Sequence, residues 1–289
     1  MTSSNQNIKT MKKLHITILT DNRCPGEGLL CEHGLSIWIE VDNKRILFDT
    51  GQSDLLFHNA AKLGINLKSV DILVLSHGHY DHTTGVSRIL ELNPEIKVFC
   101  HPHIFKPRYS RHTDGEMKFI GMSLSACSSL NRVSGNINWL TKPLFAGNEA
   151  GITGPIPRET DFEDTGGDFY YDREGYAPDP ITDDMAIWFK SNKGLIIISG
   201  CCHSGIVNTS EYSLRISSQE KIRSVVGGFH LHNASSERIN KTVEYLKEKS
   251  IETLIPLHCT GNKAIELLNA GLGETVIEGQ TGTRITFDL

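Results

Sequence analysis

The feature that most constrains this chain is the stretch His77-Gly78-His79-Tyr80-Asp81-His82, which holds three imidazoles and a carboxylate within six positions. It directly follows the apolar run 70–75, whose β-branched and leucine residues are typical of a buried strand. Thr83 and Thr84 could cap a helix whose apolar stripe occupies residues 86–90. The pattern therefore predicts a strand, a loop that carries metal ligands, and a helix.

The spacing of these side chains suits a metal site. His77 and His79 are two residues apart, so in an extended segment both rings point the same way and can share one ion. Asp81 and His82 follow at the turn into the helix, where they can reach a second ion. Imidazole and carboxylate are the ligands that many divalent ions prefer. The alternative is a histidine-rich surface loop, but so dense a cluster rarely arises by chance from 13 histidines in 289 residues.

The stretch 77–82 resembles the HxHxDH signature of the metallo-β-lactamase superfamily, and Leu47-Phe48-Asp49-Thr50-Gly51 resembles its first motif. Further segments resemble the branch of dihydropterin–ribofuranosylaminobenzene phosphate synthase-like metallohydrolases. These segments are Glu32–Ser36, Ser199–Gly205, Gly227–Leu231 and Pro256–Gly261. Because the similar segments run from the first predicted strand to the last, the resemblance covers nearly the whole chain.

The order of the predicted elements favours an α/β fold. A hairpin is expected over residues 35–41 and 45–48, and series of strands and helices follow it in both halves of the chain. Such an order suits two packed β-sheets with helices outside. The resemblance implies the four-layer αβ/βα sandwich of the metallo-β-lactamase type, as a single domain over residues 1–289.

Two segments depart from this regular pattern. Periodicity fades near residues 106–182, where Gly, Pro, Asp and Ser are dense and aromatic residues are interspersed. Long segments of this kind in compact enzymes are usually functional lids, and the aromatic residues favour an ordered one. We therefore expect a lid-like insertion near 106–182 that covers the site and selects the substrate. The polar start of the chain predicts a disordered tail near residues 1–10.

Several predicted strands end on residues that can bind metals. The set comprises Asp49, the His77–His82 stretch, Cys201 to His203, His230 and His258. A catalytic zinc with three protein ligands needs one residue beyond each pair in the histidine stretch. We therefore assign His77, His79 and His203 to one ion. The other ion is assigned to Asp81, His82 and His258.

Four positions near this site keep two interpretations. Asp49, by resemblance, orients ligands or supports the loop, although it could simply cap a turn. The superfamily usually has an Asp that bridges both ions, and Cys201 stands in that place. A thiolate binds zinc well, yet a Cys that ends a buried strand is also a small apolar filler. His101 could be a ligand, but lining the pocket is the preferred interpretation. His230 follows a diglycine and could face the substrate or pack in the core.

The resemblance and the residue types together predict hydrolytic chemistry. One or two divalent ions, zinc first and manganese or iron as alternatives, would lower the pKa of water from roughly 15.7 to about 7. The resulting hydroxide would attack a carbonyl or phosphoryl centre. Asp81 would hold the second ion and orient the nucleophile, and His230 is the candidate proton donor to the leaving group.

The leading hypothesis is a metal-dependent hydrolase that acts on a small-molecule ester, lactone or phosphate-type substrate. One alternative is the reaction implied by the branch, a transferase that joins a dihydropterin diphosphate to a ribofuranosylaminobenzene phosphate. A second alternative is a mononuclear-iron redox enzyme, since His and carboxylate ligands also suit iron. The third is a ligand-binding regulatory protein with an idle metal site.

Composition narrows the partners and the compartment. A net charge of −5 argues against nucleic acid as the partner and leaves a small-molecule substrate. No run approaches the ~18 consecutive apolar residues of a membrane span. The seven cysteines lack a framework spacing and no secretory signal is visible, so we expect reduced thiols in the cytoplasm. The oligomeric state is not indicated by the sequence.

Overall fold

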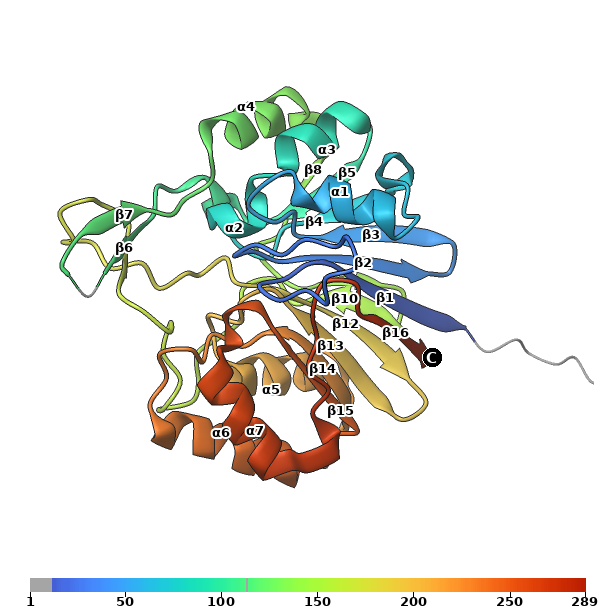
Figure 1. Ribbon diagram of the computed structural model, residues 1–289, viewed down its shortest axis with the longest axis vertical. Helices are drawn as coiled ribbons and strands as arrows, with labels where there is room; N and C mark the ends of the chain where they lie inside the picture. Colours follow the sequence, from blue (N-terminus) through green and yellow to red (C-terminus); the bar gives the residue numbers. More distant parts are fainter. Residues whose placement is uncertain (1–11, 113) are drawn as a thin grey trace, which may run out of the picture.

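The structure, a computed structural model, describes residues 12–112 and 114–289. Two large β-sheets pack face to face, with helices on both outer sides and a small third sheet projecting from one end (Figure 1). The tail expected near residues 1–10 lies outside the described residues. Within the part of the chain that is described, none of the helices combines the length and apolar character that crossing a membrane requires.

The first large sheet has seven strands in the order β16-β1-β2-β3-β4-β5-β8. They are β1 (Lys13–Thr20), β2 (Ser36–Val41), β3 (Lys44–Phe48), β4 (Ile72–Val74), β5 (Lys97–Cys100), β8 (Ile137–Trp139) and β16 (Arg284–Asp288). The predicted hairpin is confirmed as β2 and β3, and its turn residues Asp42 and Asn43 have φ of 48° and 62°. Such left-handed pairs match the twist of the flanking strands. From β3 to β8 neighbouring strands run parallel.

The second large sheet has six strands in the order β15-β14-β13-β12-β10-β9. They are β9 (Leu144–Ala146), β10 (Ala150–Ile152), β12 (Ala186–Ser191), β13 (Gly194–Ser199), β14 (Ile222–Gly228) and β15 (Thr253–Leu257). Strands β13, β14 and β15 are parallel, so their carboxyl ends meet at one edge. Residues that follow these strands are thereby brought together.

Alternation along the strands builds the layers. Ile16 and Ile18 of β1 pack with Ile196 and Ile198 of β13 in a core shared by the two sheets. Between these positions on β13, Ile197 points outward to the helices of the second half. Burying each such side chain contributes about 1.5–3 kcal/mol. Helices therefore cover both outer faces, which confirms the predicted four-layer αβ/βα sandwich.

The helices of the first half are α1 (Leu55–Lys62), α2 (Tyr80–Thr83), α3 (Val86–Leu92) and α4 (Leu124–Arg132). Those of the second half are α5 (Ile206–Ser217), α6 (Ser236–Glu248) and α7 (Asn262–Leu272). Short 3-10 helices lie at η1 (Leu67–Ser69), η2 (Pro102–Phe105), η3 (Ser134–Asn136), η4 (His258–Thr260) and η5 (Gly273–Thr275). Buried residues of α1, α3 and α4 form one core with the outer face of the first sheet, and α5 to α7 do the same for the second.

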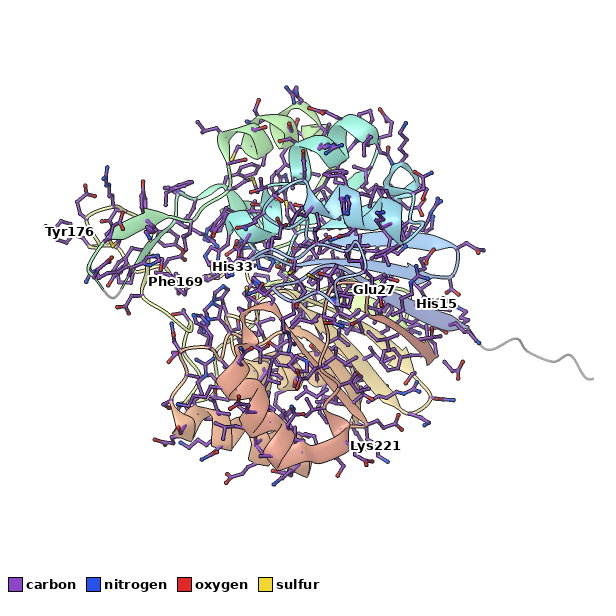
Figure 2. All side chains as sticks on the ribbon, viewed as in Figure 1. His15, Glu27, His33, Phe169, Tyr176 and Lys221 are labelled. Atoms are coloured by element: carbon purple, nitrogen blue, oxygen red, sulfur yellow. The ribbon has the colours of Figure 1, made fainter. Side chains whose placement is uncertain are left out.

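The segment 106–182 is not one continuous insertion, so these expected bounds are too wide. Helix α4 and strand β8 belong to the first half of the sandwich, while β9 and β10 extend the second sheet. Only β6 (Tyr109–Arg111), β7 (Met117–Phe119) and β11 (Phe169–Tyr170) form the separate small sheet. Figure 2 shows Phe169 where this small sheet meets the sandwich and Tyr176 at its outer end. Strands of two or three residues are too short to leave a clear periodic signal.

Candidate metal centre

The candidate site lies where strands of both large sheets end. Asp49 follows β3, and the His77–His82 stretch lies beyond β4. Cys201 to His203, His230 and His258 follow β13, β14 and β15 in turn. Asp49, Cys202, His230 and His258 all have left-handed backbone there, with φ of 60°, 60°, 43° and 49°. Non-glycine residues seldom adopt this conformation, and such strain concentrates at functional sites. The strand ends are therefore shaped to deliver side chains inward.

The stretch after β4 differs from the expected loop and cap. Asp81 and His82 lie on the one-turn helix α2 rather than in a loop. The hydroxyls of Thr83 and Thr84 do not cap α3 but donate to the backbone oxygens four residues before them, at 2.8 and 2.7 Å. Helix α3 begins after Gly85. Thr hydroxyls that bond back into the preceding turn are not free to cap the next helix.

The first group of donors consists of His77, His79 and His203, whose ligand atoms lie within 4.8 Å of one another. Nε2 of His77 is 3.0 Å from Nδ1 of His79. All three side chains are buried. Among the described residues, nothing hydrogen-bonds to Nε2 of His79 or of His203. An unpaired buried nitrogen is costly, and a cation held by Nε2 of His203 together with Nε2 of His77 and the facing Nδ1 of His79 would satisfy that of His203.

Hydrogen bonds around this first group determine which ring nitrogen carries the proton. The Ser76 hydroxyl donates to Asp49 Oδ2 at 2.7 Å, so it accepts from Nδ1 of His77 at 2.9 Å. Nδ1 of His203 donates to the carbonyl oxygen of Thr165 at 2.8 Å. Assigned in this way, Nε2 of both His77 and His203 has a lone pair that faces the site.

The second group consists of Asp81, His82 and His258. Nε2 of His258 is 3.3 Å from Asp81 Oδ2 and 3.2 Å from Nε2 of His82. Nδ1 of His82 donates to Asp49 Oδ2 at 2.7 Å, and Nδ1 of His258 bonds Oδ1 of Asn22 at 2.8 Å. The Nε2 lone pairs of two neutral rings would therefore face each other and the carboxylate. Such an arrangement is stable only with a proton or a cation among these atoms.

Burial lowers the pKa of most imidazoles in the site, whereas nearby carboxylates raise that of His82. Burial lowers the pKa of each imidazole of the first group well below its ordinary value, which keeps the metal-binding neutral form. Burial also lowers the pKa of His258 to about 4. Burial opposes the charge on His82 as well, but Asp49 and Asp81 outweigh it and raise its pKa to about 9. The site thus attracts positive charge at His82.

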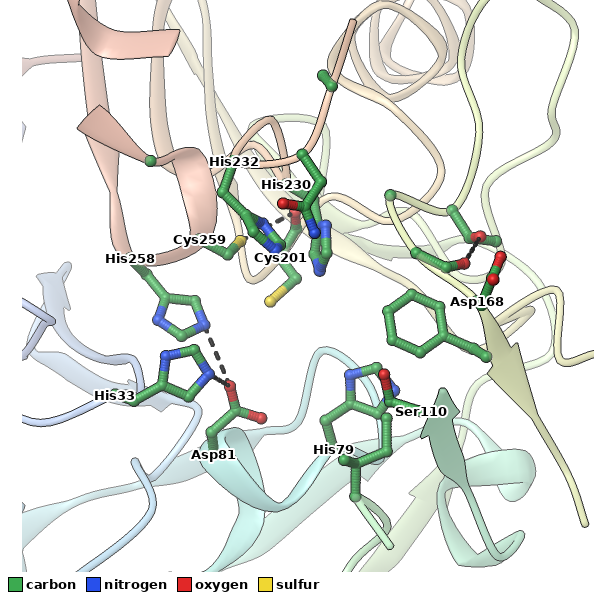
Figure 3. A pocket seen from close by; sticks show the side chains of 18 of the residues that line it. His33, His79, Asp81, Ser110, Asp168, Cys201, His230, His232, His258 and Cys259 are labelled. Carbon is green, nitrogen blue, oxygen red and sulfur yellow. Dashed lines mark hydrogen bonds and ion pairs between the residues drawn. The ribbon is translucent and has the colours of Figure 1, made fainter. Parts of the chain in front are cut away.

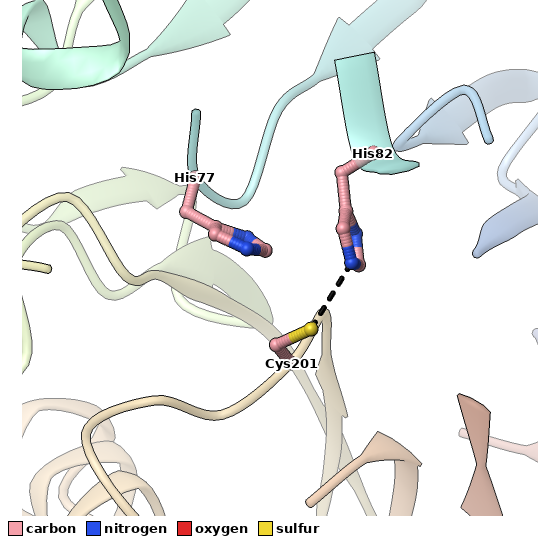
Figure 4. A group of neighbouring side chains, drawn as sticks. All are labelled: His77, His82 and Cys201. Atoms are coloured by element: carbon pink, nitrogen blue, oxygen red, sulfur yellow. Dashed lines mark hydrogen bonds between the residues drawn. The ribbon is translucent and has the colours of Figure 1, made fainter. Parts of the chain in front are cut away.

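Cys201 lies between the two groups. Its Sγ is 3.1 Å from Nε2 of His82, and the ligand atoms of Cys201, His77 and His82 all lie within 4.8 Å of one another (Figure 4). The preceding Gly200 allows this approach, because a Cβ there would lie 2.1 Å from the Ser76 hydroxyl. Cys201 thus lies beside one residue of each group, His77 of the first and His82 of the second.

A cavity of about 1060 Å³ opens beside the second group. His33, Asp81 and His258 line one side of it, and Ser110 of β6 and Asp168, just before β11, lie opposite (Figure 3). Phe169 of β11 lines the cavity as well. The Phe169 ring centroid is 5.4 Å from that of His79 and 5.3 Å from that of His203. A space of this size can accommodate an extended small molecule.

Comparison with known proteins decides the family. Residues 30–196, more than half of the chain, match the metallo-beta-lactamase superfamily. The chain belongs to the metallo-beta-lactamase superfamily. The resemblance found in the sequence is thus confirmed, together with the fold it implied.

Relatives in this superfamily confirm the resemblance to the branch as well. The chain is 36% identical over 244 residues to 7,8-dihydropterin-6-methyl-4-(beta-D-ribofuranosyl)-aminobenzene-5'-phosphate synthase of Methanocaldococcus jannaschii, with 81% of this chain and 82% of the relative covered. It is 35% identical over 257 residues to an uncharacterized protein of the same organism, with 88% and 93% covered. A solved metal-dependent hydrolase of the β-lactamase superfamily is 28% identical, with a TM-score of 0.79 and 96% and 100% of the two chains covered.

The superfamily's divalent ions fit the residues present in this chain. Imidazole and carboxylate donors face one another, and the buried Nε2 atom of His203 lacks a partner within the described part of the chain. Neutral imidazoles held by hydrogen bonds at their other nitrogen are the usual form of such ligands. The structure thus brings together every residue that the sequence assigned to the two ions.

His230 and His101 differ in their relation to the site. His230 lines the cavity, its ring centroid is 4.2 Å from that of His203, and among the described residues its Nδ1 has no partner. A Cβ on Gly166 would lie 2.1 Å from that Nδ1, so the covering loop needs glycine there. His101 instead accepts a bond from the amide of His103 and caps η2. His101 does not line the cavity, contrary to the preferred interpretation, because the proline after it starts a 3-10 turn.

Sequence reasoning missed three contributors to the site. Asn22 lies outside every motif described above, and His33 belongs only to the similar segment Glu32–Ser36, yet both line the cavity. Arg108 is buried and pairs with Asp183 and, at 3.2 Å, with Asp179. Asp183 in turn accepts a bond from the amide of Gly78 at 2.9 Å. Such long-range partners leave no local spacing by which they could be found.

Proposed function

We propose that this protein is a metal-dependent hydrolase acting on a small-molecule ester, lactone or phosphate-type substrate. The observation that supports this is the convergence of two groups of imidazole and carboxylate donors beside a large cavity. His77, His79 and His203 would hold one divalent ion. Asp81, His82 and His258 would hold a second, with Cys201 between them. When bound, such an ion supplies a Lewis acid and allows water to ionise near neutral pH.

The residues around the ions have their own tasks in this proposal. Asp49 holds Ser76 and His82 through one buried carboxylate, and so it orients donors without reaching the ion. His230 lines the cavity and is the candidate proton donor to the leaving group of the substrate. Because burial lowers the pKa of its imidazole well below the ordinary value, it would have to gain that proton in the complex with substrate. Phe169 and its strand cover the first group and exclude water from it. The bound substrate is thereby oriented between the two sides of the cavity.

The experiment that tests this proposal combines metal analysis with an activity screen. Protein purified anaerobically is analysed for zinc, manganese and iron, and then assayed on phosphodiester, lactone and ester substrates before and after treatment with a chelator. We expect one or two equivalents of zinc, turnover of one of these classes, and loss of turnover on chelation. Iron as the bound metal with no hydrolysis would favour the redox alternative. An inert protein that only binds small molecules would favour the regulatory one.

A transferase is the second candidate, because of the 36% identity to the synthase over 82% of its length. Hydrolysis and transfer differ in the nucleophile, which is water in one case and an arylamine or its ring in the other. Incubation of the protein with a dihydropterin diphosphate, with and without a ribofuranosylaminobenzene phosphate, distinguishes them. A joined product only in the presence of the acceptor supports the transferase. Hydrolysis that is indifferent to the acceptor supports the hydrolase.

A further inference from the structure

The segment between β1 and β2 reaches the second group of donors from outside the histidine stretch. It begins with Asp21, whose buried carboxylate accepts a bond from the amide of His258 at 2.6 Å. Asn22 and His33 lie at its two ends, and both line the cavity. Between them, the side chain of Asn59 on α1 donates to the backbone oxygen of Leu30 at 2.8 Å. The ends of the segment are therefore fixed relative to the site.

Asn22 has an orientation that its neighbours determine. The amide N–H of Gly34, which can only donate, bonds Oδ1 of Asn22 at 3.2 Å. Because Oδ1 is an acceptor, Nδ1 of His258 must carry the hydrogen that it directs to the same atom at 2.8 Å. The remaining Nδ2 group of Asn22 is a donor and lies 3.4 Å from Nδ1 of His33. Nδ1 of His33 is therefore the acceptor, and its hydrogen is on Nε2.

These two tautomers give opposite roles to two rings that face the same atom. Nε2 of His33 lies 3.1 Å from Asp81 Oδ2, and Nε2 of His258 lies 3.3 Å from it (Figure 3). His33 presents an N–H to the carboxylate, whereas His258 presents a lone pair. A carboxylate accepts hydrogen bonds and cannot donate one when ionised. His33 thus holds the carboxylate, and His258 is left to face a cation.

We propose that His33 is a positioning residue that donates from Nε2 to Asp81 and orients this carboxylate toward the ion that Asp81 shares with His82 and His258. Asn22 sets the tautomer of His33 that makes this possible. This inference rests on the proposed metal centre. Ligand atoms of His33, Asp81 and His258 also lie within 4.8 Å of one another, so His33 could be considered a ligand. The contact with Asn22 argues against that role, because it leaves no lone pair on Nε2.

Exposure separates His33 from the other imidazoles of the site. Its side chain is 54% exposed, whereas those of His82 and His258 are fully buried. Removing His33 should therefore leave the fold intact and a gap that opens to the cavity. A small imidazole from solution could enter that gap and donate to Asp81 in its place. A role confined to supporting the fold would show no such rescue.

The first test measures zinc binding by competition with a chromogenic chelator in the unaltered protein, His33→Ala, His33→Gln and the control His112→Ala. His112 also lines the cavity but directly follows β6 of the small sheet. We expect two equivalents in the unaltered protein and about 10–100-fold weaker binding of the second one in His33→Ala. Added imidazole should restore much of that loss, and His33→Gln should lose less because its amide keeps a donor. His112→Ala should bind both equivalents as the unaltered protein does.

The second test reads the tautomer of His33 directly from ¹⁵N chemical shifts of the unaltered, metal-free protein, with His33→Gln used to assign the signals. We expect hydrogen on Nε2 and none on Nδ1; hydrogen on Nδ1 alone overturns the inference. Unchanged binding of the second equivalent in His33→Ala also overturns it while leaving the metal centre standing. Binding of only one equivalent of zinc by the unaltered protein also overturns the inference, because the second ion that His33 would support is then absent. Failure of the unaltered protein to bind zinc, manganese or iron at all contradicts the proposed function itself.

Discussion

Asp49 is the single residue on which most of the donor geometry depends. One carboxylate, fully buried, accepts bonds from the amide and hydroxyl of Ser76 and from Nδ1 of His82, each at 2.7 Å. Through Ser76 it also sets the tautomer of His77. Both proposed ions are therefore held by residues that Asp49 orients. Its sequence context alone left a turn cap as an equal interpretation, because these partners lie far along the chain.

Replacing Asp49 by Asn tests this role at constant size. The Asn side chain keeps one acceptor oxygen, but its NH₂ group is a donor and would face either Ser76 or His82. The tautomer of His77, which Ser76 sets, or that of His82 would then no longer be fixed. We expect Asp49→Asn to bind zinc about 10–100-fold more weakly than the unaltered protein. Isothermal titration of the metal-free variants measures this change. Affinity equal to that of the unaltered protein would show that Asp49 does not orient the donors.

Among the elements, the small sheet is coupled to the histidine stretch by a buried ion pair. Arg108, just before β6, pairs with Asp183 and Asp179, and Asp183 accepts the bond from the amide of Gly78. Gly78 is needed there, because a Cβ would lie 2.6 Å from the backbone oxygen of Ile104. The position of the first histidines thus depends on residues near both ends of the 106–182 segment.

Removal of the arginine from this pair should destabilise the fold. Arg108→Met leaves two buried carboxylates without their cation, which costs about 3–5 kcal/mol of unfolding free energy. Urea denaturation followed by circular dichroism measures the loss. The control is Arg88→Met, which breaks an exposed pair with Asp54 and a contact with the Phe57 ring and should cost no more than about 1 kcal/mol. Equal midpoints for the two variants would mean that the buried pair has no structural role.

Phe169 of β11 is the residue of the small sheet that is proposed to cover the first group of donors. Phe169→Ala removes the ring beside His79 and His203 without altering a donor, so metal content should stay the same. The kcat/KM for the substrate found in the screen should fall about tenfold, equivalent to about 1.4 kcal/mol of the activation barrier. Tyr176→Ala, at an 87% exposed aromatic residue, should leave kcat/KM unchanged. A loss of metal in Phe169→Ala would assign the ring to the support of the ligands instead.

Which parts of the molecule the sequence could predict depends on whether their signal is local in the chain or comes from distant residues. Strand β1 alternates apolar and polar residues, and β13 is a short apolar run, so both strands have a local sequence signal. The residues of the two donor groups follow apolar runs of this kind and could be predicted in the same way. The small sheet could not, because its strands have only two or three residues each. Asn22 and Arg108 act on partners 236 and 75 positions away. Contacts of that kind become visible only when the chain is folded.

For the whole molecule, the proposed metal centre would join the two halves of the sandwich. His77, His79, Asp81 and His82 come from the first half, and His203 and His258 come from the second. An ion that binds only the folded state stabilises it by about 2.7 kcal/mol when its concentration is 100 times the Kd. We therefore expect chelation to lower the thermal midpoint, and added zinc to restore it. A midpoint that does not respond to chelator would contradict a centre that spans both halves.

The most direct test of the central claim is a crystal structure with diffraction data collected on both sides of the absorption edge of the bound metal. We predict anomalous peaks at the strand ends, one among His77, His79 and His203 and another among Asp81, His82 and His258. Absence of any peak, or a peak that contacts neither group, would contradict the account.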